Sequence, residues 1–193
     1  HIERKDLYTN LKTRVSYLQS FLGWTEADGE ALQAAAPYIA PLIPTVLEVV
    51  YTKLLTYDIT ARAFATRSTS YEGPMDEFPA LDSPQIKYRK NFLKAYLKKL
   101  VTGDSTQPEF WEYLDKVGMM HTGMGRRHPL HVDYIHMNAL LGYVNDIIVT
   151  AVLENEGLDL PTKTAVVRAL GKVLWIQNDL FAKWYVTDGA EYT

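Results

Sequence analysis

The sequence contains no cysteine among its 193 residues. This absence excludes disulfide bonds and thiolate metal ligands, so His, Asp, Glu and Tyr remain as the ordinary protein ligands for a metal ion. The chain also lacks a long basic run, and its formal net charge is −3. Proteins that bind nucleic acids normally have a strongly basic surface, so we expect no nucleic-acid partner.

Long uninterrupted hydrophobic runs are missing as well. The most apolar stretch, residues 134–153, is interrupted by four polar residues: His136, Asn138, Asn145 and Asp146. A membrane-spanning helix needs about 20 mostly apolar residues. The opening HIERKDLYTN is polar and does not resemble a secretory signal. We therefore expect a cytoplasmic protein that has no membrane partner.

Helical periodicity extends from end to end, and alternating strand patterns of useful length are absent. The sequence predicts an all-α fold with seven to eight helices in a single domain, residues 1–193, of which residues 1–24 form an N-terminal helical extension. The expected helices are residues 7–21, 25–36, 46–57, 59–65, 84–100, 106–121, 132–154 and 161–186.

Several local signals set the expected helix ends. Gly23 closes the first helix, and the sequence T-E-A-D from Thr25 opens the next with a capping box. A second capping box, T-Q-P-E from Thr106, is expected to open the helix that ends at Gly123, Gly125 and Pro129. Residues 67–82 are rich in Gly, Pro and Ser and predict a loop long enough to carry function.

One histidine, in the stretch 114-LDKVGMMHTGMG-125, has no nearby acid or second histidine to account for it. One helical face carries residues at spacings of four, three and four: Phe110, Leu114, Val117 and His121. This spacing directs the imidazole of His121 into the interior. Gly118 lies on much the same face, where glycine costs roughly 0.5–1 kcal/mol relative to alanine, so we expect a bulky group to approach there.

Two interpretations of His121 are open from the residues alone. The first is a core histidine bonded to a backbone carbonyl. The second is a ligand to haem iron, which needs one protein ligand because the porphyrin supplies the other four; a bare ion would need three or four. The pair His128 and His131 indicates zinc only weakly, because no carboxylate stands at ligand spacing. Met119 and Met120 are expected to fill core space.

Three segments together resemble a known family. The sequence 117-VGMMH-121, followed by a Gly/basic loop and a long helix, resembles the proximal-histidine segment of protoglobins and of the globin domains of globin-coupled sensors, which commonly reads Ile-Gly-x-x-His. In 46-VLEVVYTKLL-55, Tyr51 falls where these proteins carry a distal tyrosine. In 88-YRKNFLKAYL-97, Phe92 falls where they carry a distal phenylalanine. The likeness covers nearly the whole chain, although Val50 replaces a frequent tryptophan.

This resemblance implies a globin-like fold that binds haem b at a five-coordinate iron held by His121. It implies reversible binding of O₂, CO and NO, as a carrier or a gas sensor, with Tyr51 donating a hydrogen bond to bound O₂. Further candidate pocket residues are Val46, Val50, Leu54, Leu93, Tyr96, Val117 and Met120. Candidate partners of the haem propionates are Arg89, Arg126, Arg127 and His128.

Two other functions remain open. The chain could be a haem-free globin-like interaction module, or a haem enzyme of the NO dioxygenase or peroxidase type, although the sequence demands no enzyme activity. No catalytic triad motif, P-loop or dinucleotide fingerprint is present. The resemblance also implies a homodimer through the last two helices, whose candidate contact aromatics are Trp175, Phe181, Trp184 and Tyr185.

Overall fold

The computed structural model describes residues 1–128 and 130–192. In this part of the chain 72% of the residues are helical and there is no strand, which confirms the all-α prediction. The α-helices are α1 Arg4–Thr9, α2 Leu11–Leu22, α3 Glu26–Ile39, α4 Ile43–Thr56, α5 Asp58–Ala61, α6 Pro84–Thr102, α7 Pro108–His121, α8 Tyr134–Glu154 and α9 Leu160–Ala182. Three short 3₁₀ helices occupy Ala40–Leu42, Arg62–Ala65 and Ala190–Tyr192.

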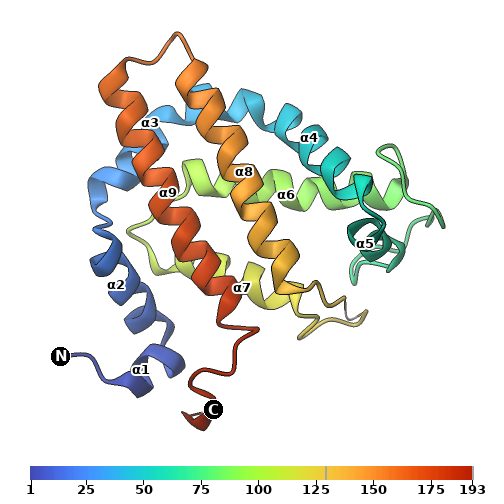
Figure 1. Cartoon of the computed structure of the whole chain (residues 1–193), viewed down its shortest axis with the longest axis horizontal. Coiled ribbons are helices and arrows are strands. Elements are labelled where there is room, and N and C mark those ends of the chain that lie inside the picture. Colours follow the sequence, from blue (N-terminus) through green and yellow to red (C-terminus); the bar gives the residue numbers. More distant parts are fainter. Residues whose placement is uncertain (129, 193) are drawn as a thin grey trace.

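Helix α9 is the central element of the fold. It pairs with α8 as a helical hairpin, and it also packs against α3, α7 and α2, while α4 crosses α6 (Figure 1). Its buried residues recur every three to four positions, as a helix covered on several sides requires: Val166, Ala169, Leu170, Val173, Leu174, Ile176, Gln177, Leu180 and Phe181. Of the helices that carry the candidate site, α7 packs directly on α9, whereas α4 and α6 pack on α8 and α3, respectively, which in turn contact α9.

The first expected helix is divided in two. Asn10 adopts an extended conformation (φ −128°, ψ 108°), and its side chain accepts a hydrogen bond of 3.1 Å from the Thr13 amide. Asn10 thus caps α2 and ends α1, so the prediction of one helix over residues 7–21 was wrong at this point. Gly23 closes α2 with φ +65°, as predicted.

Of the two predicted capping boxes, the one at Thr25 is present in the structure and the one at Thr106 is not. The box at Thr25 is present, and the Thr25 amide donates to the Asp28 carboxylate at 2.7 Å. The box at Thr106 is wrong, because the amide and hydroxyl of Thr106 donate to the Asp104 carboxylate, at 2.9 and 2.6 Å. Helix α7 begins at Pro108 instead, with Gln107 as its N-cap.

The end of α7 is set by glycines. His121 is its last residue, and Gly123 and Gly125 follow with φ of +82° and +68°. These values lie in the left-handed region that favours glycine, and they confirm the predicted helix end. Pro129, which we expected to contribute to this end, lies outside the described residues.

The two ends of the chain pack together, as Figure 1 shows. Arg14 on α2 donates two hydrogen bonds, of 2.6 and 2.9 Å, to the Asp179 carboxylate on α9. Tyr8 stacks on Tyr192 with ring centres 6.4 Å apart. The N-terminal helices are therefore attached to the C-terminal half by a bidentate ion pair and an aromatic contact.

Among the described residues, two helical stretches are long and apolar enough to cross a membrane by length and composition: Glu26–Thr56 and Tyr134–Glu154. The core helices of water-soluble proteins often meet this criterion as well. The first stretch contains Pro37, Pro41 and Pro44 and is interrupted by a 3₁₀ turn. In the second, only 22% of the most apolar window is buried, so α8 presents apolar residues at the surface of the molecule.

Candidate functional site

The ring of His121 is held in one orientation by its own helix. Its Nδ1 lies 2.7 Å from the Val117 carbonyl oxygen. A carbonyl oxygen cannot donate, so Nδ1 carries the proton in this contact and Nε2 presents its lone pair. No hydrogen-bond partner for Nε2 lies within residues 1–128 and 130–192. The Phe181 ring packs edge-on against the imidazole, with centres 5.5 Å apart.

Burial lowers the pKa of His121 below its ordinary value of 6.5, and the positive charges of Arg126 and Arg89 lower it further. The neutral imidazole is therefore the favoured form at neutral pH. In metal-bound histidines the ring is likewise neutral, one nitrogen donates a hydrogen bond to the protein, and the other nitrogen is available to bind the metal. The described residues contain no group of three or more His, Asp or Glu that could hold a metal ion by itself.

Gly118 explains how close α9 comes to this helix. A Cβ at this position would collide with the Leu180 carbonyl oxygen and would lie 3.2 Å from Cδ1 of Trp184. The bulky group predicted to approach Gly118 is thus the backbone of α9. Asp115 adds to the same contact by accepting hydrogen bonds from Trp184 Nε1 at 2.9 Å and, as an ion pair, from Lys183 Nζ at 2.8 Å.

Tyr51 lies on α4 and is only 6% exposed. Its ring packs against Phe64, with centres 5.6 Å apart, and the Lys90 ammonium lies 5.9 Å from the ring centre. The structure assigns its hydroxyl no hydrogen-bond partner among the described residues. Burial raises the pKa of Tyr51, so the phenol is protonated and can act as a donor at neutral pH.

Two arginines face this region without an acidic partner. Arg89 on α6 donates from Nη2 to the Thr66 carbonyl, and its guanidinium carbon lies 5.4 Å from the centre of the Phe64 ring. Its Nε is buried and has no hydrogen-bond partner among the described residues. Arg126 follows α7, and burial lowers the pKa of both guanidiniums. Neither belongs to an ion pair in the described part of the chain.

The remaining candidate pocket residues differ in how deeply they are buried. Val50 is fully buried on α4, and Val117, Leu54 and Leu93 are partly buried against the core. Phe92 is 47% exposed and packs edge-on against Tyr88, with centres 5.2 Å apart. Its place in the wall of a haem pocket stays a prediction.

Among the other candidates, Met120 and Tyr96 are at least partly buried, whereas Arg127 and His131 are exposed. Met120 is partly buried on α7, beside His121. Tyr96 is 8% exposed, and its hydroxyl is buried without a partner among the described residues. Arg127 is exposed, with Nη1 3.9 Å from the Glu72 carboxylate. Nε2 of His131 lies 3.7 Å from the Asp133 carboxylate, and the described residues contain no group of three possible ligands that could form a zinc site.

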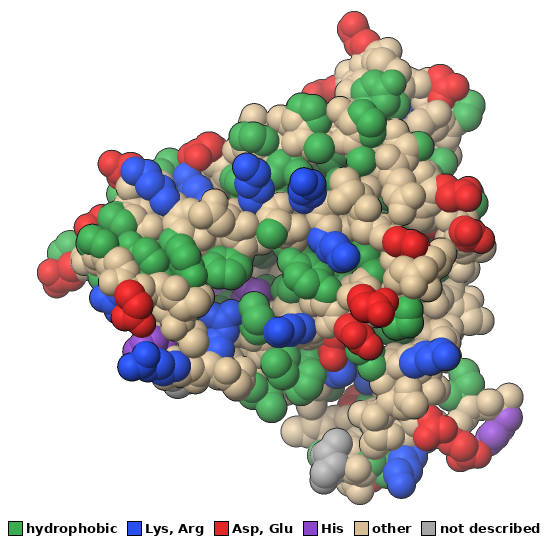
Figure 2. Space-filling model, turned by 180° about the vertical axis from the view of Figure 1, so that it is seen from behind, with side chains coloured by type: hydrophobic (Ala, Val, Ile, Leu, Met, Phe, Trp, Pro, Cys, Tyr) green, Lys and Arg blue, Asp and Glu red, His purple; other side chains and the backbone are tan. Residues whose placement is uncertain are grey.

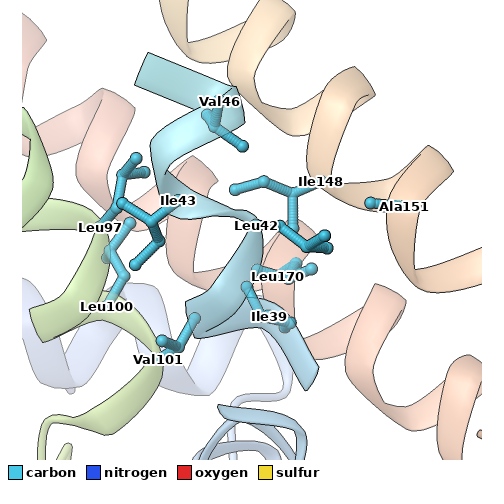
Figure 3. Close-up of a pocket in the computed structure, with 10 residues that line it drawn as sticks. All are labelled: Ile39, Leu42, Ile43, Val46, Leu97, Leu100, Val101, Ile148, Ala151 and Leu170. Atoms are coloured by element: carbon cyan, nitrogen blue, oxygen red, sulfur yellow. The ribbon is translucent and has the colours of Figure 1, made fainter. Parts of the chain in front are cut away.

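Two cavities lie away from His121. An apolar cavity of about 20 Å³ lies between α4, α6, α8 and α9. Figure 3 shows the side chains that line it. Val46, one of the candidate haem-pocket residues, lines this cavity. A surface groove of about 420 Å³ lies between α2 and the first turns of α3 and α7. Neither cavity is lined by His121.

A third depression is visible on the face drawn in Figure 2. A histidine side chain lies at its floor, and hydrophobic and basic side chains form its rim. This arrangement places an imidazole within reach of a ligand that enters from the surface. Apolar walls and a cationic rim suit a flat hydrophobic molecule that carries negative charge at one edge.

Sequence reasoning missed Phe64 and Thr66. Phe64 is buried and contacts both Tyr51 and Arg89, and the Thr66 carbonyl accepts from Arg89. Phe64 lies near the end of the short 59–65 segment, and Thr66 follows it. This segment has no distinctive motif. Only the fold of the chain between α4 and α6 brings them to the site.

The comparisons with known proteins agree with this geometry. Among solved structures, 23 chains match. One is the globin domain of Geobacter sulfurreducens globin-coupled sensor, with a TM-score of 0.69 and 18% identity over 88% of this chain and 96% of that one. No curated protein sequence matches. The helical fold of this chain is therefore globin-like.

The family model described as Protoglobin matches residues 11–191. Because this match spans most of the chain, the protein belongs to the protoglobin family. Globins in general bind haem, so membership supports haem as the group that the site receives.

Proposed function

We propose that the protein binds haem b through His121 and reversibly binds O₂, CO and NO at the open side of the iron. The observation that carries this proposal is the orientation of His121. Its Nδ1–H is tied to the Val117 carbonyl, so the Nε2 lone pair is available to a metal. Bound haem would supply an iron with one free coordination position for a diatomic gas.

The residues present fit haem in three respects. A single histidine suffices, because the porphyrin supplies the other ligands. Val50, Leu93 and other apolar side chains suit the macrocycle. Arg126 has no carboxylate partner in the described chain, and the haem propionates are anions that need a cation. We propose that Arg126, which lies nearest to His121 in sequence, pairs with a propionate.

We assign Tyr51 to the ligand side of the pocket. A protonated phenol whose hydroxyl has no protein partner can donate to bound O₂, which carries partial negative charge. Bound CO is less polar and gains less from such a donor. Phe64 fixes the ring of Tyr51, and Val50 occupies the preceding position, where it leaves more room than a tryptophan would.

Haem titration of the purified apoprotein tests this function. We expect a 1:1 complex with an intense Soret band that shifts when dithionite and CO are added. His121→Ala should lose this band or lower the haem affinity strongly, whereas His131→Ala, a matched surface histidine, should retain it. A wild-type protein that refuses haem would instead favour the haem-free interaction module. Rapid NO or peroxide turnover would favour the enzyme.

One of the solved structures that this chain resembles is the globin domain of a globin-coupled sensor, and this supports a sensor over a carrier. We further propose a homodimer through α8 and α9. These helices and their ends expose large apolar side chains: Ile135 69%, Leu153 51%, Leu160 72% and Trp175 64%. Of the four aromatic candidates only Trp175 is strongly exposed, while Phe181 is buried at 2%. Exposed apolar area of this kind is typical of an interface.

A further inference from the structure

Arg89 is an unusual cation, because it is partly buried and poorly paired. Its Nη2 donates to the Thr66 carbonyl, but its Nε is buried without a partner, and no carboxylate pairs with it in the described residues. A buried donor without a partner costs roughly 1–3 kcal/mol, and more when it is charged. A neighbouring anion would remove this cost.

The contacts of Arg89 place it beside Tyr51. The Phe64 ring lies 5.6 Å from the Tyr51 ring, and the Arg89 guanidinium carbon lies 5.4 Å from the centre of the same Phe64 ring. Both side chains therefore contact the same aromatic ring, and the positive charge of Arg89 opposes the rise that burial causes in the pKa of Tyr51. These contacts place Arg89 on the Tyr51 side of the site.

Helix α6 determines this position. Arg89 stands one turn before Leu93, and residues four apart share a helical face. Leu93 is partly buried against the core, so the stem of Arg89 points toward the same interior. Lys90, the next residue, instead pairs with the Glu48 carboxylate at 2.7 Å. The neighbouring lysine is thus neutralised by an acid, and Arg89 is not.

We propose that Arg89 and Tyr51 together form a binding site for small anions, such as azide, fluoride or nitrite, on ferric haem. This inference rests on the proposed function. The anion would bind the iron, accept a hydrogen bond from the Tyr51 hydroxyl and interact with the Arg89 guanidinium. A fixed cation favours anionic ligands over neutral ones, so CO on ferrous haem should be almost insensitive to Arg89.

The test is a set of absorption titrations of the ferric holoprotein with azide and with fluoride. Arg89→Met should weaken both anions roughly tenfold to a hundredfold, the effect of losing one charge-assisted hydrogen bond. Arg89→Lys keeps the charge and should lose less. Lys87→Met removes an exposed positive charge from the same helix and is the matched control, and it should leave anion affinity within about twofold.

Failure of this proposal and failure of the proposed function give different results. Azide affinity that is unchanged in Arg89→Met, with full haem content, would overturn the proposal. Loss of haem from both Arg89→Met and Arg89→Lys would also overturn it, because Arg89 would then serve a propionate. Failure of the wild-type protein to take up haem would refute the proposed function itself, and the Soret band reports this result before any anion is added.

Discussion

Gly118 offers the sharpest test of how α7 and α9 are packed. Replacing it with alanine places a Cβ against the Leu180 carbonyl oxygen, a backbone atom that cannot rotate away. Alanine gains roughly 0.5–1 kcal/mol of helix propensity, but overpacking of this kind typically costs about 1–3 kcal/mol or more. We expect Gly118→Ala to lower the free energy of unfolding by about 1–2 kcal/mol.

Gly171 provides a matched control on α9. It is also a mid-helix glycine, and a Cβ there would meet nothing within 4 Å. Gly171→Ala should raise the free energy of unfolding by roughly 0.5–1 kcal/mol. Urea unfolding followed by far-UV circular dichroism measures both variants, and thermal melts should separate them by roughly 4–12 °C. Equal stability of the two variants would refute the close approach of α9 to Gly118.

Three further predictions concern the site and the assembly. Tyr51→Phe should speed O₂ dissociation roughly tenfold, as measured by stopped flow, while CO dissociation changes less than about twofold; equal changes would mean that the hydroxyl points elsewhere. Because the folded state lowers the pKa of His121, the unfolded apoprotein binds a proton first as the pH falls through 6.5. The free energy of unfolding should therefore fall on acidification, and His121 should contribute up to about 1.4 kcal/mol per pH unit to this fall. Urea unfolding at two pH values measures it, and the contribution of His121 should be absent in His121→Gln. An identical pH slope in both proteins would contradict it. Trp175→Glu should shift the molar mass measured by light scattering from dimer to monomer, and a monomeric wild type would refute the dimer.

The helices and the inward face of α7 could be predicted from sequence because both depend on local spacing. Phe110, Leu114 and His121 share a face through helical geometry alone. The errors arose where two local signals competed. Thr106 bonds to the Asp104 carboxylate instead of capping α7, and Asn10 divides a helix whose apolar pattern is continuous. Neither preference is visible in periodicity.

The candidate site could be predicted only in part, since contacts between distant segments determine the rest. Phe64 joins Tyr51 to Arg89 because the chain between α4 and α6 folds over both, and no local pattern marks it. On α6, adjacent residues such as Phe92 and Leu93 differ by about 100° in direction around the helix. Only the packing of α6 on its neighbours decides that Leu93 meets the core.

The most direct test of the account is resonance Raman spectroscopy of the ferrous haem-loaded protein. The account predicts an iron–histidine stretching band in the wild type, its loss in His121→Gly, and the return of an iron–imidazole band when imidazole is added to that variant. An unchanged iron–histidine band in His121→Gly would contradict it, because another residue would then hold the iron.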